Sequence, residues 1–425
     1  MESIRLDAPA GGHIDEEQCR AALEQLFQGR ALKRVLLLPP DLTRLHSFAG
    51  RLTAMAWQML KGRAQVDILP ALGTHAAMEP EELHALFGTE IPLSAYRVHD
   101  WRRDVVTLGT VPGELIERVS EGRLTYDIAV QVNRLLLEGY DLILSLGQVV
   151  PHEVAGMANH AKNIFVGVGG LDMIHRTHFL GAVCGMERAL GNDHAPVRQV
   201  FDWAAERFLR DLPLVYALTV VRAEDGQDRL KGLYLGDQRD AFEAAVACSR
   251  RENIVWLDRP LQRAVCYVEP QEFRSFWLAN KSIYRTRMAM ADGGRLVVLA
   301  PAVARFGEDA GMDALLRKYG YHGTDAILQA VRENADLGEN LSAAAHLIHG
   351  SSEGRFEVVY AAPRMTRQEV EAAGFGWMDW DEAEARYGAL VRSVQNDGFQ
   401  TDGEGEFYYV PNPALGLWRT GERGS

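Results

Sequence analysis

The residues best suited to chemistry lie close together in the middle of the sequence, between Ser145 and His178. An apolar run at 140–146 leads into this stretch, which then carries His152 and Lys162. Imidazoles exchange protons near neutral pH and bind metals, and a desolvated lysine amine is a nucleophile or a covalent anchor for a cofactor. Polar groups that follow buried strands are a common way for α/β enzymes to build a site. The sequence therefore predicts an active site along this stretch.

Each candidate also has an ordinary structural explanation. His75 follows Gly-Thr after an apolar run, where a histidine is more often a helix cap or a core hydrogen-bonder than a catalyst. His152 follows Val-Val-Pro, which restricts its direction, but a plain loop histidine is the alternative. Lys162 lies among apolar residues, where a lysine is costly unless it is exposed or used. His175 and His178 are three residues apart and could face one side of a helix, although such a pair is weak evidence for a metal site.

A second cluster follows the apolar run at 34–38. Asp41 and Arg44 place a carboxylate and a guanidinium directly after this predicted strand. They could form a mutual salt bridge with Asp41 as a helix cap, or Arg44 could clamp a substrate carboxylate with its planar fork. The glycine-rich run at 167–170 lacks the spacing of a dinucleotide-binding or P-loop motif and is more typical of a plain turn.

The elements that must position these groups alternate between strands and helices. Short apolar runs predict buried strands, and runs with apolar residues on one face predict helices. This order predicts an α/β fold with mostly parallel sheets, in which strand ends gather the site. The strands expected in the first part are 34–38, 66–72, 96–99, 104–108, 127–133, 140–146, 214–221 and 232–235, and the helices are 16–29, 48–61, 194–209, 240–248 and one that opens at 79.

A second series of elements begins after Arg259-Pro260, which predicts two α/β domains, 1–259 and 260–425, with the active site in the cleft between them. The first would hold the cofactor and the catalytic groups, and the second would close the site. From Asp402 the chain is rich in glycine, proline and aromatic residues, so we expect ordered coil that could pack back on the first domain. The elements expected here are strands 264–268, 294–300 and 356–360 and helices 271–291, 311–319, 324–333, 341–348 and 381–394.

Composition limits the class of protein. The chain has 425 residues, with 45 basic and 58 acidic side chains and a net charge of −13, which argues against a nucleic-acid partner. The four cysteines show no C-x-x-C pair, which fits reduced thiols in the cytoplasm rather than a disulfide framework. Neither a signal peptide nor a run of eighteen apolar residues is present, so we expect a soluble cytoplasmic protein without a membrane partner.

The candidates together resemble the lactate racemase family, whose members use a nickel-pincer nucleotide. The order and rough spacing hold across about 240 residues. The most specific parts are the ten residues from His152 to Lys162 and the sixteen from there to His178. The residues that carry the resemblance are Asp41-x-Thr-Arg44, Gly73-Thr-His75 with Met78, Val132-Asn-Arg134, Gly147-x-x-x-Pro-His152, Gly156, Lys162, Gly167, Thr-His178 and Lys281.

The resemblance implies a cofactor and the residues that hold it. The cofactor is nickel bound by pyridinium-3-thioamide-5-thiocarboxylic acid mononucleotide, which separate cofactor-synthesis enzymes make. Lys162 would hold the nucleotide through a thioamide bond, and His178 would be the protein ligand of nickel. Asp41 would orient neighbouring groups at the cofactor.

The resemblance also implies an isomerase acting on α-hydroxy acids. His75 and His152 would be acid/base groups on opposite faces of the substrate, and Arg44 and Lys281 would hold its carboxylate. Hydride would leave C2 for the nickel-pincer nucleotide to give a planar 2-keto acid, and its return to the other face would invert C2. The alternatives are a Schiff-base or metal-dependent lyase that uses Lys162 and His178, and a non-catalytic sugar-acid-binding protein.

Three departures from the family concern the substrate. Asn159-His160 stands where the racemases usually have Gly-Gly, and Trp277-Leu278 stands where Tyr-Gln is expected. After Arg44 the usual proline is replaced by Leu45-His46-Ser47. Trp277, Asn159 and His160 are therefore further candidate substrate contacts. The added polar groups favour an acid larger and more hydroxylated than lactate, such as an aldonate.

Overall fold

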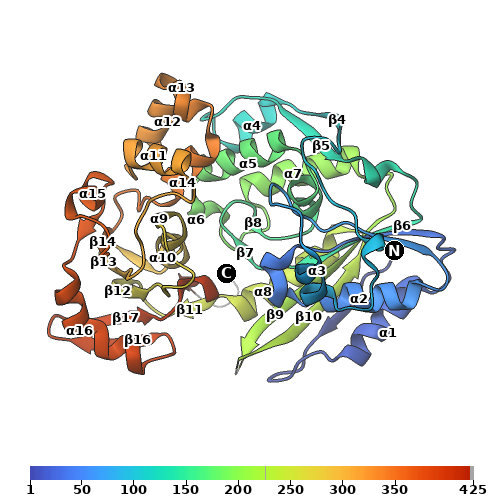
Figure 1. The fold of residues 1–425 in the computed structure, drawn as a ribbon, viewed down its shortest axis with the longest axis horizontal. Helices are drawn as coiled ribbons and strands as arrows, with labels where there is room; N and C mark the ends of the chain where they lie inside the picture. The colour runs from blue at the N-terminus through green and yellow to red at the C-terminus, as the bar shows by residue number, and fades with distance from the viewer. Residues whose placement is uncertain (225, 422–425) are drawn as a thin grey trace. The chain divides into compact units, whose positions relative to one another are not determined.

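The chain forms two compact units in the computed structural model, which describes residues 1–224 and 226–421 (Figure 1). The first unit contains Met1–Leu180 and Arg188–Asn253, and the second contains Gly181–Glu187 and the chain from Ile254 onward. The chain thus passes from the first unit to the second at Ile254, a few residues before the predicted boundary at Arg259-Pro260. The domain limits 1–259 and 260–425 stay a proposal.

The first unit is built on a six-stranded sheet in which parallel pairing dominates. Strands β3, β2, β6 and β9 run parallel to one another, and β10 and β1 are added antiparallel at one edge. This arrangement confirms the predicted α/β class for the first unit. The sheet order is β1 (Ile4–Asp7), β10 (Gln227–Gly236), β9 (Leu214–Glu224), β6 (Leu142–Gln148), β2 (Arg34–Leu38) and β3 (Gln65–Ile68).

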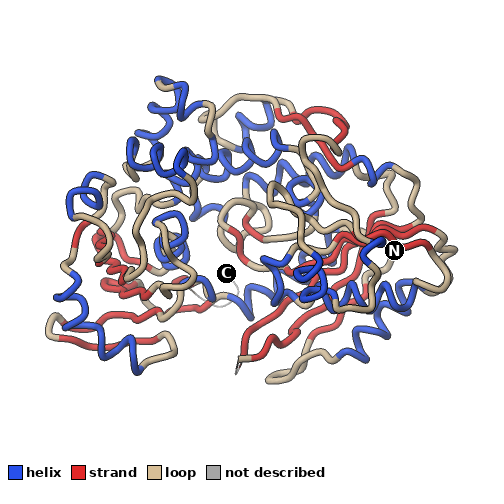
Figure 2. Tube along the Cα trace, viewed as in Figure 1, coloured by secondary structure: helices blue, strands red, loops and turns tan. Residues whose placement is uncertain are grey.

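The central strands are apolar throughout because both faces of the sheet are covered. Successive side chains of a strand point to opposite faces. Val35 and Leu37 of β2 belong to the core shared with α1 (Glu16–Phe27) and α2 (Ala49–Leu60), whereas Leu36 between them is equally buried and faces the other way. Helix α8 (Arg239–Asn253) packs on β9 and β10. Figure 2 shows helices on both sides of these strands.

Shorter elements of the first unit extend from this sheet, and several of them carry the candidate site. Strands β4 (Val105–Val111) and β5 (Ile128–Asn133) pair antiparallel, as do β7 (Pro151–His152) and β8 (Gly156–Met157). A π-helix, η4 (Asn163–Gly167), follows Lys162. The other helices are η1 (Leu42–Ser47), α3 (Pro80–Phe87), η2 (Leu93–Ala95), α4 (Gly113–Val119), η3 (Arg134–Leu137), α5 (Leu171–Cys184, whose last turn belongs to the second unit), α6 (Met186–Ala189, at the unit boundary) and α7 (Pro196–Phe208).

The second unit has its own six-stranded sheet, parallel except for its last strand. Helix α16 (Trp380–Ser393) covers one face and contributes Ala383 and Tyr387 to the core. The order is β15 (Gly376–Trp377), β14 (Glu357–Ala361), β13 (Met290–Leu299), β12 (Leu261–Tyr267), β17 (Gly405–Val410) and β16 (Gly398–Asp402). The remaining elements are the pair β11 (Val255–Leu257) and β18 (Trp418–Thr420) and the helices α9 (Phe276–Ala279), α10 (Lys281–Thr286), α11 (Ala310–Tyr319), α12 (Thr324–Glu333), α13 (Ala335–Gly338), α14 (Leu341–His349), α15 (Arg367–Ala372) and η5 (Pro413–Leu415).

Three predicted elements are wrong. The helix expected at 271–291 is two short helices that meet at the buried Asn280, whose side chain accepts a hydrogen bond from the Tyr360 hydroxyl (2.7 Å). The strand expected at 96–99 reduces to one bridge between Ile68 and Tyr96. The tail expected as coil supplies β17, which pairs with β12 in the second unit.

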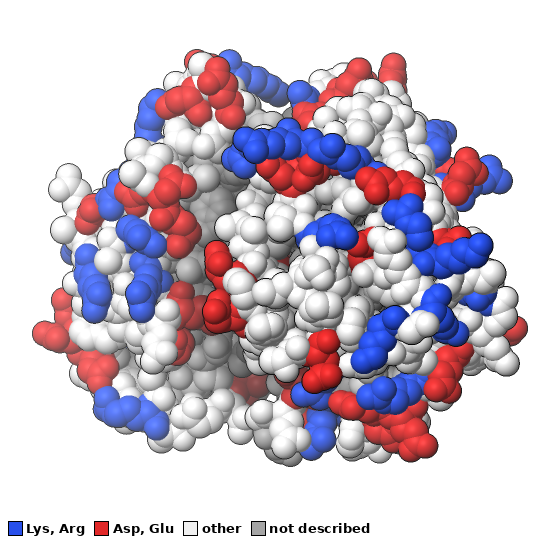
Figure 3. All heavy atoms as spheres, turned by 45° about the vertical axis from the view of Figure 1, so that its right-hand side comes forward, with Lys and Arg blue, Asp and Glu red and all other residues white. Residues whose placement is uncertain are grey.

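The charged side chains and the cysteines are distributed as in an ordinary globular protein. On the face drawn in Figure 3, basic and acidic side chains are interspersed, without a large patch of one sign. All four cysteines are buried. Within residues 1–224 and 226–421, no helix is both long enough and apolar enough to cross a membrane.

The contact between α2 and α3 gives a test of the packing. A Cβ atom added at Gly50 of α2 would lie 2.1 Å from the Leu86 carbonyl oxygen of α3. We expect Gly50→Ala to lower the free energy of unfolding by about 1–3 kcal/mol through overpacking, although alanine is normally the better helix residue. Urea unfolding measures this change. Gly62→Ala, where no atom lies within 4 Å, is the matched control and should change stability by less than about 0.5 kcal/mol; equal effects would contradict the close contact.

Candidate active site

A cavity of about 280 Å³ in the first unit lies where β2, β3 and β6 end. Carboxyl ends of parallel strands are where open α/β sheets bind ligands. The loop after β2, the loop after β3, the segment after β6 and helix α5 all contribute side chains. The lining residues are Pro40, Asp41, Thr43, Arg44, Ala71, Leu72, Gly73, Thr74, His75, Gln148, His152, Ala158, Asn159, Lys162, Asn163, Val166, Gly167, Ile174 and His178.

Asp41 and His75 form an ion pair at one side of the cavity. Asp41 Oδ2 lies 2.5 Å from His75 Nδ1, and Oδ1 accepts hydrogen bonds from the Thr43 backbone N–H (3.2 Å) and hydroxyl (2.5 Å). Hydrogen bonds to His75 and Thr43 lower the pKa of Asp41 although burial opposes them. The same carboxylate raises the pKa of His75. Asp41 therefore caps η1, as one reading of the sequence suggested, and also orients a histidine.

His152 is held very differently. It lies in the two-residue strand β7, and only 8% of its surface is exposed. Its Nδ1 accepts hydrogen bonds from the backbone N–H groups of Val154 (3.1 Å) and Ala155 (3.3 Å). Burial lowers the pKa of His152 well below its ordinary value, and the nearby charge of Lys162 acts in the same direction. The ring is therefore neutral at physiological pH.

Lys162 lies in the same cavity, just before η4. Burial and the neighbouring Arg44 lower the pKa of Lys162 to about 8, so the unprotonated amine is a minor form near neutral pH but far more populated than in an exposed lysine. The next residue fixes its position, because Asn163 Nδ2 donates to the Leu38 carbonyl (3.2 Å) and to the Ser145 hydroxyl (2.9 Å). These two bonds connect the lysine-bearing turn to the end of β2 and to the middle of β6.

His178 presents one nitrogen that suits metal binding. Its Nδ1 donates to the Ile174 carbonyl one helical turn earlier (2.6 Å), which leaves an unprotonated Nε2 in the neutral ring. Burial lowers the pKa of His178 to about 4. A metal-ligating histidine is normally oriented in this way by a bond from its other nitrogen. His175, its neighbour in α5, does not line the cavity.

The Asn159-His160 turn has an unusual backbone. Both residues have positive φ (64° and 57°), which is uncommon for residues other than glycine. Arg198 of α7, fully buried, donates to the carbonyls of Met157 (2.5 Å) and Asn159 (3.2 Å) and so holds the turn. Sequence reasoning missed Arg198, because an arginine in an amphipathic helix gives no sign of burial.

The side chains of Asn159 and His160 have different surroundings. Asn159 lines the cavity, and its Oδ1 accepts from the His160 N–H (2.6 Å). The His160 ring instead stacks between Tyr216 (4.2 Å between ring centroids) and Phe242 (4.8 Å), away from the cavity lining. The structure thus brings Asn159 to the other candidates and gives His160 a packing position.

The two candidates from the second unit have local partners. Lys281 Nζ lies 3.1 Å from a Glu272 carboxylate oxygen, and the Trp277 ring stacks on His346 (3.9 Å between centroids). The substrate-binding roles of Lys281 and Trp277 stay predictions.

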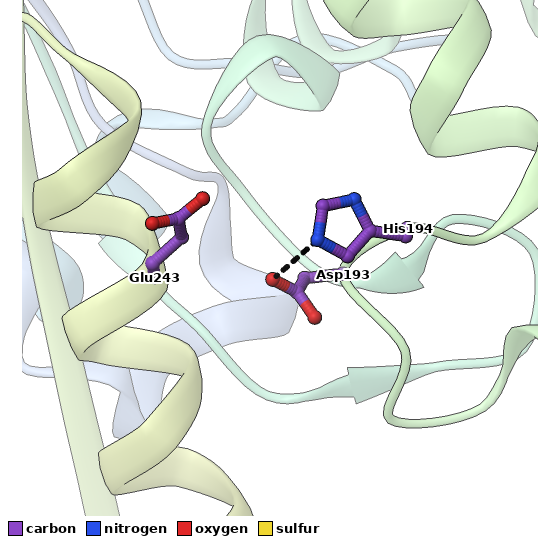
Figure 4. Close-up of side chains that lie close together, drawn as sticks. All are labelled: Asp193, His194 and Glu243. Carbon is purple, nitrogen blue, oxygen red and sulfur yellow. Dashed lines mark ion pairs between the residues drawn. The ribbon is translucent and has the colours of Figure 1, made fainter.

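A group of side chains outside the cavity has the composition of a metal site. Asp193, His194 and Glu243 are the one such group among the described residues (Figure 4). However, Arg239 lies 3.6 Å from Asp193 and 3.0 Å from Glu243, and Arg250 lies 2.9 Å from Asp193. Two guanidinium groups already neutralise these carboxylates, so the cluster is an ion-pair network.

Comparison with known proteins points to one family. Residues 13–190 match the family model described as the lactate racemase N-terminal domain. A lactate racemase from Thermoanaerobacterium thermosaccharolyticum is 28% identical over 161 residues, which are 37% of this chain and 34% of that protein. The match therefore spans about a third of the length of this curated relative. The family resemblance seen in the sequence is confirmed.

Two solved structures share the fold over nearly the whole chain. A Thermotoga maritima protein aligns with a TM-score of 0.78 and 24% identity, covering 98% of this chain and 100% of that one. The lactate racemase apoprotein from Thermoanaerobacterium thermosaccharolyticum aligns with a TM-score of 0.69 and 17% identity, covering 93% of this chain and 88% of that one. At these identities the likeness concerns the fold.

The Asp41–His75 pair predicts a measurable pKa shift. The pKa of His75 should lie above 6.5 in the wild type and should fall in Asp41→Asn, as read by NMR titration. Because folding raises this pKa, the pair stabilises the fold below pH 6.5, and that contribution disappears as the pH rises through the folded value. Asp228→Asn, which removes the partner of the exposed His46 (2.7 Å), is the control and should leave His75 unchanged. An unshifted His75 in Asp41→Asn would disprove the pairing.

Proposed function

We propose that this chain, which belongs to the lactate racemase family through the domain at residues 13–190, is a racemase or 2-epimerase of α-hydroxy acids. It would invert C2 by reversible hydride transfer through a planar 2-keto acid. The observation that carries the proposal is that one cavity of the first unit combines two histidines of different protonation with a lysine of lowered pKa and a metal-competent histidine.

The residues present fit the nickel-pincer nucleotide. Lys162, with its pKa lowered to about 8, can supply the neutral amine that a thioamide linkage contains. His178 offers an unprotonated Nε2 to nickel because Nδ1 is bonded to a carbonyl. One imidazole is enough, since the pincer itself brings the other donors. When bound, the cofactor supplies the hydride acceptor.

The protein side chains would bind the substrate and move its hydroxyl proton. Arg44 lines the cavity and would pair with the carboxylate through its planar fork. His75, oriented by Asp41, can take the proton of the C2 hydroxyl at Nε2. His152 lines the same cavity and would be the second acid/base group, on the opposite face of the substrate. Lys281 is a candidate second cation for the carboxylate.

Asn159 supports a substrate with more polar groups than lactate. Its Oδ1 is occupied by the His160 N–H, so the amide orientation is set and Nδ2 is the group left for a ligand. This Nδ2 packs closely against Gly147, where an added Cβ atom would lie 1.9 Å away. A fixed N–H donor suits a hydroxyl or carboxylate on the substrate chain, as in an aldonate. His160, packed between two rings, would act on the substrate only through this turn.

A Schiff-base lyase is the second candidate, because a lysine with lowered pKa also attacks carbonyls. Borohydride trapping of a substrate on Lys162 without nickel would favour it. A sugar-acid-binding protein would show thermal stabilisation by the acid but no turnover after nickel loading.

Cofactor attachment is the first test. Intact mass after expression with the cofactor-synthesis enzymes should show an adduct on Lys162 together with stoichiometric nickel. Lys162→Ala should lose both, and His178→Ala should keep the adduct but lose most nickel, because the imidazole ligand is gone. Lys61→Ala, a lysine over the Trp57 ring, is the control and should keep both. An unmodified Lys162 in protein expressed this way would rule out the mechanism.

The substrate is tested by a hydroxy-acid panel read by chiral chromatography. We expect wild-type holoenzyme to prefer aldonates over lactate. Asn159→Asp keeps the size and the bond to the His160 N–H but removes the Nδ2 donor, so it should lower the kcat/KM ratio of aldonate to lactate by about 3- to 10-fold, the value of one hydrogen bond. An unchanged ratio would remove Asn159 from substrate recognition.

A further inference from the structure

A fully buried arginine, Arg198 of α7, lies beside the segment that leads to Lys162. Its Nη2 donates to the carbonyls of Met157 (2.5 Å) and Asn159 (3.2 Å), and none of its surface is exposed. Among the described residues, its Nε and Nη1 atoms have no hydrogen-bond partner. Burial of a charged group is costly, and hydrogen bonds offset part of that cost. The hydrogen bonds of this buried charge go to one short stretch of backbone.

That stretch needs support because two successive residues in it have a strained backbone. Asn159 and His160 have φ angles of 64° and 57°, a left-handed conformation that is unfavourable for residues with a Cβ atom. The Asn159 carbonyl belongs to the peptide group between these two residues. A guanidinium bond to this carbonyl fixes the orientation of that peptide group. It therefore opposes rotation of the turn toward ordinary backbone angles.

The strained turn runs directly into the turn that contains Lys162. The Asn163 N–H donates to the His160 carbonyl (2.9 Å) and closes this second turn around the lysine. The Asn163 end is fixed independently, because its side chain is bonded to two strands of the sheet. The His160 end depends on the backbone conformation that Arg198 supports. The lysine is thus held from two sides, by Asn163 and, through the strained turn, by Arg198.

We propose that Arg198 is a positioning residue for Lys162, which holds the Asn159-His160 turn in its left-handed conformation and so sets where the lysine enters the cavity. Arg198 does not line the cavity, so it acts through the turn and touches neither substrate nor cofactor. Phe242 packs on both partners, since its ring centroid lies 4.7 Å from the Arg198 guanidinium carbon and 4.8 Å from the His160 ring centroid. The inference rests on the proposed function, in which Lys162 anchors the nucleotide.

Two other roles for Arg198 lead to different expectations. A packing role would affect stability in the same way whichever residues form the turn. A charge role would act on Lys162 through space, because the positive charge of Arg198 adds to burial and Arg44 in lowering the pKa of that lysine. Glycine separates both roles from positioning, since it adopts positive φ without steric cost. With glycine at positions 159 and 160, the turn no longer depends on the guanidinium.

The first test is a double-mutant cycle on the protein without cofactor, measured by urea unfolding. Arg198→Met removes the donors but keeps a side chain of similar length. We expect it to lower the urea midpoint in the wild-type background and to lower it less in the Asn159→Gly/His160→Gly background. Arg207→Met, which replaces an exposed arginine of α7 over the Trp203 ring, is the matched control and should leave the midpoint unchanged in both. Equal shifts for Arg198→Met in the two backgrounds overturn the proposal.

The second test measures the fraction of Lys162 that carries the nucleotide after expression with the cofactor-synthesis enzymes, by peptide mass spectrometry of the folded protein. Arg198→Met should lower this fraction by about 10-fold, because two charge-assisted hydrogen bonds to the turn are lost. Arg198→Lys keeps a charged donor and should lose less. In the Asn159→Gly/His160→Gly background, Arg198→Met should match the glycine variant itself.

The outcomes separate this inference from the proposed function. If the glycine pair does not restore the modified fraction in Arg198→Met, the proposal is overturned, and recovery by Arg198→Lys alone would assign the charge role instead. A modified wild type that inverts no hydroxy acid refutes the proposed function and leaves the positioning role standing. A wild type that takes up no nucleotide refutes the proposed mechanism, and the urea cycle still decides whether Arg198 holds the turn.

Discussion

Burial of ionisable groups at the carboxyl ends of β2, β3 and β6 is the constraint on which the site depends. A buried amine or imidazole loses hydration, so its charged form becomes costly and its pKa falls. This holds for His152, Lys162 and His178. His75 differs because it has a carboxylate partner. One cavity therefore holds a protonatable histidine beside two histidines that favour the neutral form and a lysine that loses its proton more readily than an exposed one.

The backbone supports this arrangement at a local cost. Two successive residues with positive φ, Asn159 and His160, cost on the order of 1–3 kcal/mol each. Arg198 compensates by bonding the carbonyls of the turn, and the aromatic stack fixes the His160 ring. The turn ends directly before Ala161-Lys162. The contacts that stabilise its strained backbone therefore also position the lysine. Such a turn would be easier with glycine, which adopts positive φ without steric cost.

Apolar runs and helical periodicity were sufficient to predict most elements, because the pattern of apolar residues shows which face of each helix or strand is buried. The failures share a cause. Asn280, between the two short helices, is bonded to Tyr360, which lies far away in sequence. The tail forms β17 because β12 offers a free edge. The Asp193, His194 and Glu243 group shows the converse, since its residue types suggest a metal and its arginine neighbours decide otherwise.

The sequence by itself determined the α/β class, the resemblance to one family and the identity of the groups near the strand ends, because strand order and residue spacing are local properties. Only the tertiary structure decided how these groups are protonated. Asp41 and His75 are 34 residues apart, yet their contact sets the state of both. The backbone N–H groups that restrict His152, and the placement of Asn159 in the cavity with His160 outside it, likewise come from the folded geometry. Hydrogen-bond direction and burial depend on three-dimensional neighbours, and residue type alone does not encode them.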